Sequence, residues 1–349
     1  MRKANLMVLG ALVAATAVAC GGGASPTAVP ASRAPGGTSG AAGAPLLVAI
    51  NKSADQQYFV DLQGSFVETA TSLGANAATQ DARLDPSLAV SLVNEAIAAG
   101  ARGIAITVPD QAIGPAVARA ARDAGVVLVA TDDAIKDADG NPVPFVGFDG
   151  KEMGRQVGEA AAQLLIDEAW LRDSTRKVGV LSVEVQALSA CNDRTDGSKA
   201  AIRAAGVPDA QVFSVPYTGE TTSARDAAGP VITSNPDITD WVVFGCNDEG
   251  VAGALDMLAT AGVDPASIIA VGLGAYEACK PWAAGRPTGF RAALFISGLD
   301  VGQMAATVLH EAVAEGTALP ATSYAPTVMV NRATFKNVMD PVSVESCSK

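Results

Sequence analysis

Short apolar runs alternate with helical patterns along most of the chain. Leu46–Ile50 is a continuous apolar run typical of a buried strand, and apolar side chains then recur at steps of three and four residues from Phe59 to Leu73. The same strand-and-helix unit recurs with strands near 76–80, 103–108 and 126–132. Because strands that alternate with helices form parallel sheets, this part of the chain predicts a doubly wound α/β unit.

The second half of the chain repeats this pattern. A short strand over 145–148 and a helix from about 150 to 170 lead into it. Further strands are predicted near 178–182, 211–215, 240–244 and 268–272, followed by a strand over 290–296, a helix over about 299–314 and a last strand over 325–330. Two similar parallel-sheet lobes are therefore expected, and the late segments need not belong to the second one.

Length and composition agree with two globular domains. The chain has 349 residues, of which 49% are hydrophobic and 17% are charged, so wholesale disorder is not expected. The formal net charge of −12 argues against a nucleic-acid partner, because phosphate binding needs a basic surface.

The first residues have the pattern of a targeting segment. Arg2 and Lys3 precede an apolar run over Leu6–Ala19, which is too short to span a bilayer and is typical of a signal peptide. The run ends in small residues before Cys20, which resembles a bacterial lipobox, although Ala17 stands where Leu is usual. We predict a lipoprotein signal peptide over residues 1–20 with lipidation of Cys20, and ordinary cleavage near Ala19 is the alternative.

Residues 21–44 are rich in Gly, Ala, Ser, Pro and Thr. Such a segment cannot bury enough apolar surface to offset its ordering entropy, so it is predicted to be a flexible tether. Beyond Cys20, the chain has four cysteines: Cys191, Cys246, Cys279 and Cys347. They permit up to two disulfides in any of three pairings, or they are free buried thiols.

Polar residues follow the predicted strands, where a doubly wound fold places its binding site. Lys52 follows the first strand and precedes Gln56, Tyr58 and Phe59, and Asp132-Asp133 follows the strand near 126–132. Because successive side chains of a strand point to opposite faces, one of these two aspartates is expected to face the crevice and the other to brace the loop. A solvated turn is the alternative.

The second half places Arg194 and Asn247 at the corresponding edge. They offer a bidentate donor and a mixed donor and acceptor. Asn192 or Asp193 is an alternative helix cap, and Asp248 is expected to cap the helix after its strand.

The sequence offers little for catalysis. His310 is the only histidine and lies in an amphipathic pattern, so a Ser-His-Asp triad or a histidine-rich metal site would need unusual partners. Gly272–Glu277 begins like a dinucleotide loop but has Glu277 where the third glycine belongs. We expect no enzyme activity, no cofactor and no metal.

Taken in order, several short motifs resemble the periplasmic sugar-binding proteins of ABC transporters, in particular the L-arabinose-binding proteins. The resemblance extends from about Leu46 to Val338 and rests on five motifs: Lys52 with Tyr58-Phe59, Thr131-Asp132-Asp133, Arg194–Ser198, Ala204–Pro208 and Gly245–Asp248. It implies two α/β lobes joined by a three-segment hinge. The first lobe would comprise 45–149 plus 297–327, and the second 150–296 plus 328–349.

The resemblance also implies a sugar site. Lys52, Asp132, Asp133, Arg194 and Asn247 would hydrogen-bond the sugar, and Tyr58 and Phe59 would line the pocket. We assign the direct contact to Asp133, and a contact or a bracing role to Asp132. The chain departs from the arabinose binders at four positions: Gln56 replaces Glu, Phe148 replaces Met, Gly274 replaces Asn and Glu277 replaces Asp.

These observations predict an extracytoplasmic, lipid-anchored receptor that closes on a monosaccharide and docks on the membrane permease of an ABC importer. L-Arabinose is the first candidate, before galactose, fucose or xylose, and the protein is expected to be a monomer. The alternatives are a sensory receptor subunit for chemotaxis or kinase signalling, an extracellular enzyme on the same fold, and a sugar-responsive repressor. The repressor would need an N-terminal DNA-binding helix pair, and the enzyme a nucleophile with a base.

Overall fold

The computed structural model of the chain describes residues 43–348. The predicted signal peptide, Cys20 and all but the end of the tether lie outside the described residues. Within residues 43–348, no helix is both long enough and apolar enough to cross a bilayer, and no group of three or more His, Cys, Asp or Glu side chains could hold a metal ion.

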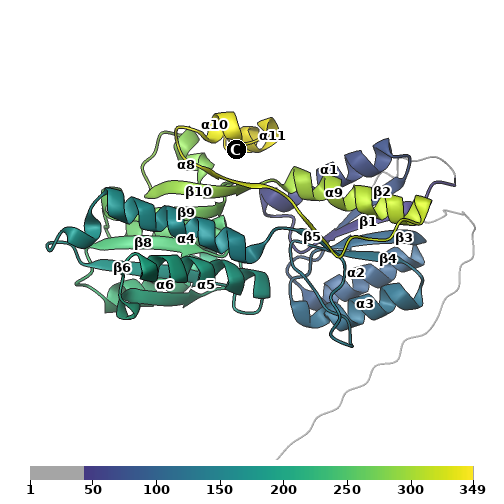
Figure 1. Cartoon of the computed structure of the whole chain (residues 1–349), viewed down its shortest axis with the longest axis horizontal. Helices are drawn as coiled ribbons and strands as arrows, with labels where there is room; N and C mark the ends of the chain where they lie inside the picture. The colour runs from purple at the N-terminus through teal and green to yellow at the C-terminus, as the bar shows by residue number, and fades with distance from the viewer. Residues whose placement is uncertain (1–42, 349) are drawn as a thin grey trace, which may run out of the picture. The chain divides into compact units, whose positions relative to one another are not determined.

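Five strands from the first half of the chain and one from near its end form a sheet of six parallel strands (Figure 1). Successive residues of β1 point to opposite faces of this sheet. Leu47 and Ala49 pack with α1 and α9, whereas Val48 and Ile50 pack with α2 and α3. In spatial order the strands are β11 (Thr322–Tyr324), β5 (Phe145–Gly147), β4 (Val127–Thr131), β3 (Ala101–Ile106), β1 (Leu46–Asn51) and β2 (Asn76–Asp81). The helices are α1 (Gln57–Ser72), α2 (Pro86–Ala98), α3 (Gly114–Asp123) and α9 (Gly298–His310).

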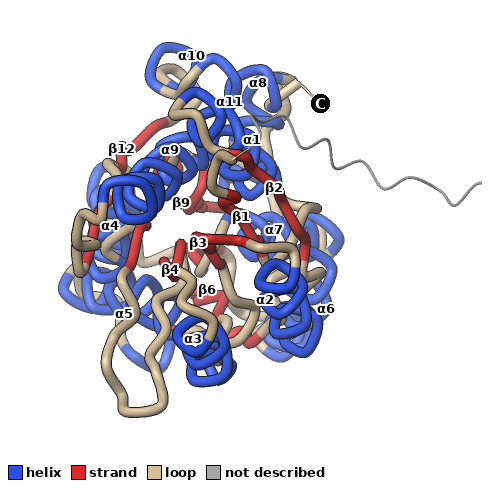
Figure 2. Tube along the Cα trace, turned by 90° about the vertical axis from the view of Figure 1, so that its right-hand side faces the viewer, coloured by secondary structure: helices blue, strands red, loops and turns tan. Residues whose placement is uncertain are grey.

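A second sheet of six strands is built in the same way. Its strands are parallel except for the last, which runs antiparallel to its neighbour. In spatial order they are β12 (Thr327–Val330), β10 (Phe290–Ile296), β9 (Ile268–Gly274), β8 (Asp240–Gly245), β6 (Val178–Glu184) and β7 (Val212–Pro216). Helix α4 (Gly150–Asp167) packs on α5 (Ser189–Ala204), and α6 (Thr221–Ser234) packs on α7 (Asp248–Thr260) (Figure 2). The predicted fold class, with two doubly wound lobes, is confirmed.

The chain passes between the sheets three times. It leaves the first sheet after β5, returns after β10 so that α9 packs on α1, and leaves again between β11 and β12. The strand expected over 325–330 is present as β12, from Thr327 to Val330, whereas β11 was not predicted. Ala325-Pro326 separates these two strands, which belong to different sheets. Proline has no N–H to give to a strand ladder, which suits it to the crossing point. The lobe boundaries that we predicted remain a proposal.

The end of the chain contains elements that the periodicity did not indicate. Three short helices are present: α8 (Cys279–Ala283), α10 (Phe335–Val338) and α11 (Pro341–Ser346). A disulfide between Cys279 and Cys347, with Cα atoms 5.3 Å apart, ties α11 to α8. The helix predicted over 299–314 ends at His310, and a π-helical turn continues it over Glu311–Glu315.

Candidate functional site

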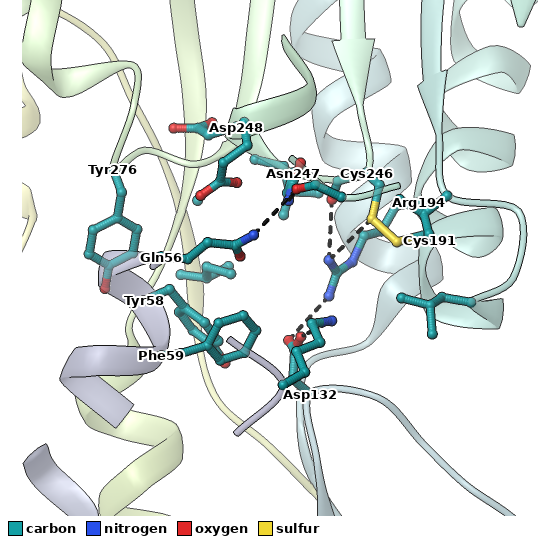
Figure 3. A pocket seen from close by; sticks show the side chains of 18 of the residues that line it. Gln56, Tyr58, Phe59, Asp132, Cys191, Arg194, Cys246, Asn247, Asp248 and Tyr276 are labelled. Carbon is teal, nitrogen blue, oxygen red and sulfur yellow. Dashed lines mark hydrogen bonds and ion pairs between the residues drawn. A yellow bond between two sulfur atoms is a disulfide. The ribbon is translucent and has the colours of Figure 1, made fainter. Parts of the chain in front are cut away.

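A cavity of about 70 Å³ lies between the carboxyl edges of the two sheets. Its walls come from the residues that end or follow β1 and β4 in the first sheet, and from the corresponding loops after β8 and β9 in the second. This is the edge at which parallel α/β sheets bind ligands. Figure 3 shows side chains from both edges pointing into the same space.

Most of the residues that the sequence predicted lie on this cavity. The lining includes Lys52, Gln56, Tyr58, Phe59, Asp132, Arg194, Asn247 and Gly274. Three other predicted residues are not among the lining: Asp133 lies behind Lys52, the ring of Phe148 is buried 6.3 Å from that of Tyr58, and Glu277 pairs with Lys280 at 2.5 Å.

The two aspartates after β4 do not follow strand alternation. The strand ends at Thr131, and Asp132 adopts a left-handed backbone with φ of +57°. Asp is one of the few residues that adopt this conformation readily. The turn places Asp132 on the cavity wall, whereas Asp133 is buried behind it, so alternation does not decide their roles.

A buried charge cluster surrounds Asp132. The Lys52 ammonium lies 2.5 Å from Asp133 Oδ2 and 3.6 Å from Asp132 Oδ2, and Arg194 Nη2 lies 3.4 Å from Asp132 Oδ1. Burial alone would lower the pKa of Lys52, but the two carboxylates outweigh burial and raise it above its ordinary value. Lys52 therefore stays charged and holds both aspartates in place.

Helix packing fixes the backbone of Arg194. A Cβ at Gly154 on α4 would lie 2.2 Å from the Arg194 carbonyl oxygen, so only glycine permits this approach of α4 to α5. The Arg194 guanidinium donates to the Cys246 carbonyl oxygen at 3.2 Å as well as to Asp132, and thus joins the edges of both sheets.

Two buried donors beside the cavity have no hydrogen-bond partner among the described residues: Arg194 Nε and the Tyr58 hydroxyl. Leaving such groups unpaired costs about 1–3 kcal/mol each. A ligand or water with acceptor oxygens in the cavity would satisfy them.

Asn247 forms the opposite wall and also begins α7. Its Oδ1 accepts from the Gly250 N–H at 3.0 Å and from the Tyr217 hydroxyl, and its Nδ2 donates to the Gly219 carbonyl oxygen at 3.3 Å. The amide of Gln56, from the first half of the chain, donates to the same Gly219 oxygen at 3.3 Å. The caps expected at Asp248 and at Asn192 or Asp193 are wrong, because Asn247 caps α7 and α5 begins earlier, at Ser189.

Asp248 and Glu249 are cavity residues that sequence reasoning missed. The Asp248 carboxylate accepts from the N–H groups of Glu277 and Ala278 at 2.9 and 3.0 Å. Burial raises the pKa of Asp248 to about 6, and burial together with the Asp248 charge raises the pKa of Glu249 to about 8. Their position directly after Asn247 was the available signal, but Asp248 was interpreted as a cap.

Gly274 contributes its backbone to the cavity wall. Gly274 has φ of +129°, a conformation that side chains other than glycine rarely adopt. The wall is therefore bare backbone at this position, beside Asp248 and Tyr276.

Comparisons with known proteins agree with this geometry. The family model described as periplasmic binding protein domain matches residues 47–321. An ABC transporter L-arabinose-binding periplasmic protein of Azospirillum brasilense is 29% identical over 316 residues, covering 87% of this chain and 92% of that protein. The L-arabinose-binding periplasmic protein of Escherichia coli is 27% identical, covering 73% of this chain and 78% of its own length.

Solved structures share the fold. A Caulobacter myo-inositol-binding protein, solved with myo-inositol, superposes with a TM-score of 0.72 at 21% identity, over 87% of this chain and 98% of that one. These relatives and structural neighbours are solute-binding proteins and not enzymes, in agreement with the absence of enzyme activity expected from the sequence. The two-sheet fold, the cavity between the sheet edges and the family match over most of the chain show that this chain belongs to the periplasmic binding proteins of ABC transporters.

Proposed function

We propose that this protein is the extracytoplasmic receptor of an ABC sugar importer and binds a monosaccharide in the cavity between the sheet edges. The observation that carries the proposal is the buried contact of Arg194 with Asp132 across the cavity. Together they present donors and acceptors that are fixed before a ligand arrives, which suits a ligand rich in hydroxyl groups.

The size of the cavity supports a single sugar ring. A volume of about 70 Å³ is several times the roughly 10–15 Å³ that one ordered water needs, which suits a small ligand and not an oligosaccharide.

L-Arabinose is the first candidate, since two relatives are named as L-arabinose-binding proteins. Galactose, fucose and xylose remain alternatives, because Gln56, Phe148, Gly274 and Glu277 depart from the arabinose binders. Each lost neutral hydrogen bond is worth about 0.5–1.5 kcal/mol, which is enough to change the preferred sugar.

The proposed roles of individual residues follow the cavity wall. Asp132, Arg194 and Asn247 hydrogen-bond the sugar hydroxyls, and Tyr58 and Phe59 contact its apolar face. Lys52 lines the cavity as well and links this wall to Asp133. The direct sugar contact assigned to Asp133 remains a prediction, and the geometry favours Asp132 for that role.

Closure of the lobes on the sugar would exclude water and allow the receptor to dock on its permease as a monomer. An anchor on Cys20 would keep it at the membrane. Release of a Cys20→Ala variant from membranes would support the anchor, and a variant that stays bound would contradict it. A sensory receptor subunit would use the same site, and loss of sugar uptake after deletion of the gene would distinguish transport from sensing.

A thermal-shift screen of the full chain against a monosaccharide panel tests the proposal. A sugar at about 100 times its Kd should stabilise the protein by about 2.7 kcal/mol. The panel contains L-arabinose, D-galactose, L-fucose, D-xylose and D-ribose. A melting temperature that does not change with any sugar would count against the proposal.

A further inference from the structure

The wall of the cavity contains a disulfide. Cys191 on α5 and Cys246 in the loop after β8 are bonded, with Cα atoms 4.8 Å apart, and both residues line the cavity (Figure 3). The bond therefore joins a helix to the strand edge at the place where a ligand would lie. The charge pairs and hydrogen bonds described above supply the polar contacts of the cavity without this disulfide.

Each cysteine is a close chain neighbour of a cavity residue. Arg194 lies one helical turn after Cys191, and Asn247 directly follows Cys246. The Arg194 guanidinium also donates to the Cys246 carbonyl oxygen at 3.2 Å and lies 4.0 Å from Cys246 Sγ. Any movement of Cys246 away from α5 would displace both the acceptor of Arg194 and the backbone of Asn247.

We propose that the Cys191–Cys246 disulfide positions Arg194 and Asn247 for the ligand, so that ligand affinity depends on whether this bond is intact. The inference rests on the proposed function. If the ligand covers the bond, it should in turn protect the bond from reductants, since the coupling of two equilibria is reciprocal.

The chain offers a matched control in its second disulfide. Cys279–Cys347 spans 68 residues and Cys191–Cys246 spans 55, so the two bonds should constrain the unfolded chain to a similar degree. All four cysteines are at most 3% exposed, but neither Cys279 nor Cys347 lines the cavity. Removing either bond should therefore lower stability similarly. Cys279 lies close in sequence to Tyr276 and to the N–H groups that hold Asp248, but only loss of the first bond should displace Arg194 and Asn247.

The test compares Cys191→Ser/Cys246→Ser with Cys279→Ser/Cys347→Ser in the full chain. Calorimetric titration with the sugar panel gives affinity, and urea unfolding without sugar gives stability. We expect similar decreases in the unfolding midpoint, but at least a tenfold loss of sugar affinity in the first variant alone. A Cys191→Ala/Cys246→Ala variant should lose the same affinity, which separates the missing bond from the added hydroxyls.

Reduction of the wild-type chain provides a second route that needs no variant. A dithiothreitol thiolate attacks one sulfur, the second thiol closes the ring, and the S–S bond becomes two thiols while dithiothreitol becomes a cyclic disulfide. Alkylation and mass spectrometry then report which bond has opened. Affinity should decrease with opening of Cys191–Cys246 and return on reoxidation, and sugar should slow that opening but not the opening of Cys279–Cys347.

Amide hydrogen exchange without sugar separates this inference from the proposed function. Loss of the Cys191–Cys246 bond should speed exchange at Cys246–Glu249, and loss of the other bond should not. Sugar binding with the same affinity in all variants would overturn the inference and leave the proposed function intact. If the wild type binds no sugar, the proposed function fails, and unchanged exchange at Cys246–Glu249 would overturn the positioning role as well.

Discussion

The two edges that face the cavity carry acidic residues in matching positions, but the carboxylates have different partners at each edge. Asp132 and Asp133 follow β4 and are held by Lys52 and Arg194. Asp248, which follows β8, is held by two backbone N–H groups. Burial raises the pKa of Asp133 above its ordinary value, although the Lys52 ammonium opposes this shift. Burial raises the pKa of Asp248 to about 6, against the hydrogen bonds of neutral backbone donors. The first edge thus pairs its carboxylates with cations, and the second provides groups that titrate near neutral pH.

The largest effect should come from removing the cation that holds the first edge. Lys52→Met leaves Asp132 and Asp133 without their ammonium partner. Breaking a buried pair in this way costs about 3–5 kcal/mol, so the free energy of unfolding in urea should decrease by that order. Lys177→Met is the control, because Lys177 is an exposed lysine in an ion pair of 3.8 Å with Asp237, and it should change the free energy by less than about 0.5 kcal/mol. Equal effects of the two variants would show that the buried pairs of Lys52 do not stabilise the first edge.

The next effect concerns the residue that joins the edges. Arg194→Ala removes the contacts with Asp132 and with the Cys246 carbonyl oxygen. Losing one partner of a buried charged hydrogen bond costs about 2–5 kcal/mol, so sugar affinity should decrease at least about 30-fold by calorimetry. Arg155→Ala on the exposed face of α4 should bind as the wild type does. A full-affinity Arg194→Ala variant would show that the contact across the cavity is not used.

The second edge should impose a pH dependence on stability. Asp248 and Glu249 have folded-state pKa values of about 6 and about 8, above the unfolded values of about 3.9 and 4.3. Between these values the folded state binds more protons than the unfolded state, so stability should fall as pH rises from about 4 to about 8. Asp248 alone accounts for about 3 kcal/mol of this fall.

Glu249→Gln isolates the upper part of this pH range. Relative to the wild type, the variant should gain stability as pH rises from about 6 to 8 in urea unfolding. The exposed Glu68→Gln serves as its control and should run parallel to the wild type. Parallel curves for all three proteins would mean that Glu249 does not titrate as described.

The smallest effect tests the neutral bridge between the edges. Gln56→Ala removes the hydrogen bond to the Gly219 carbonyl oxygen, worth about 0.5–1.5 kcal/mol, so sugar affinity should decrease about two- to tenfold. Gln57→Ala removes a bond that stays within α1, to Asp61 at 2.7 Å, and should leave affinity unchanged. A loss of affinity in both variants would point to a general effect on α1.

The fold was largely predictable because strands and helices differ in hydrophobic period. Every strand predicted up to β10 is present, since most are short buried apolar runs next to an amphipathic helix, whereas the edge strand β2 is largely polar. The strand predicted over 325–330 is present as Thr327–Val330, but β11 at Thr322–Tyr324 was missed, because three residues are too few to show a period. The short helices α10 and α11 lack enough turns to give a pattern, and contacts such as the Cys279–Cys347 disulfide hold the chain end in place.

The site was predictable by position more than by geometry. Position after a strand placed Lys52, Asp132, Arg194 and Asn247 at one edge, and they do line one cavity. The roles of the aspartates depend on the left-handed backbone at Asp132, which residue alternation does not reveal. The contributions of Glu249 and of the Cys191–Cys246 bond depend on burial and pairing across elements, which a single sequence leaves open.

The most direct test of the central claim is a crystal structure of the protein with the sugar that stabilises it most. We predict one monosaccharide in the cavity, with hydroxyls within hydrogen-bond distance of Asp132 on one side and of Arg194 and Asn247 on the other. A sugar bound elsewhere, or a cavity without sugar at saturating concentration, would contradict it.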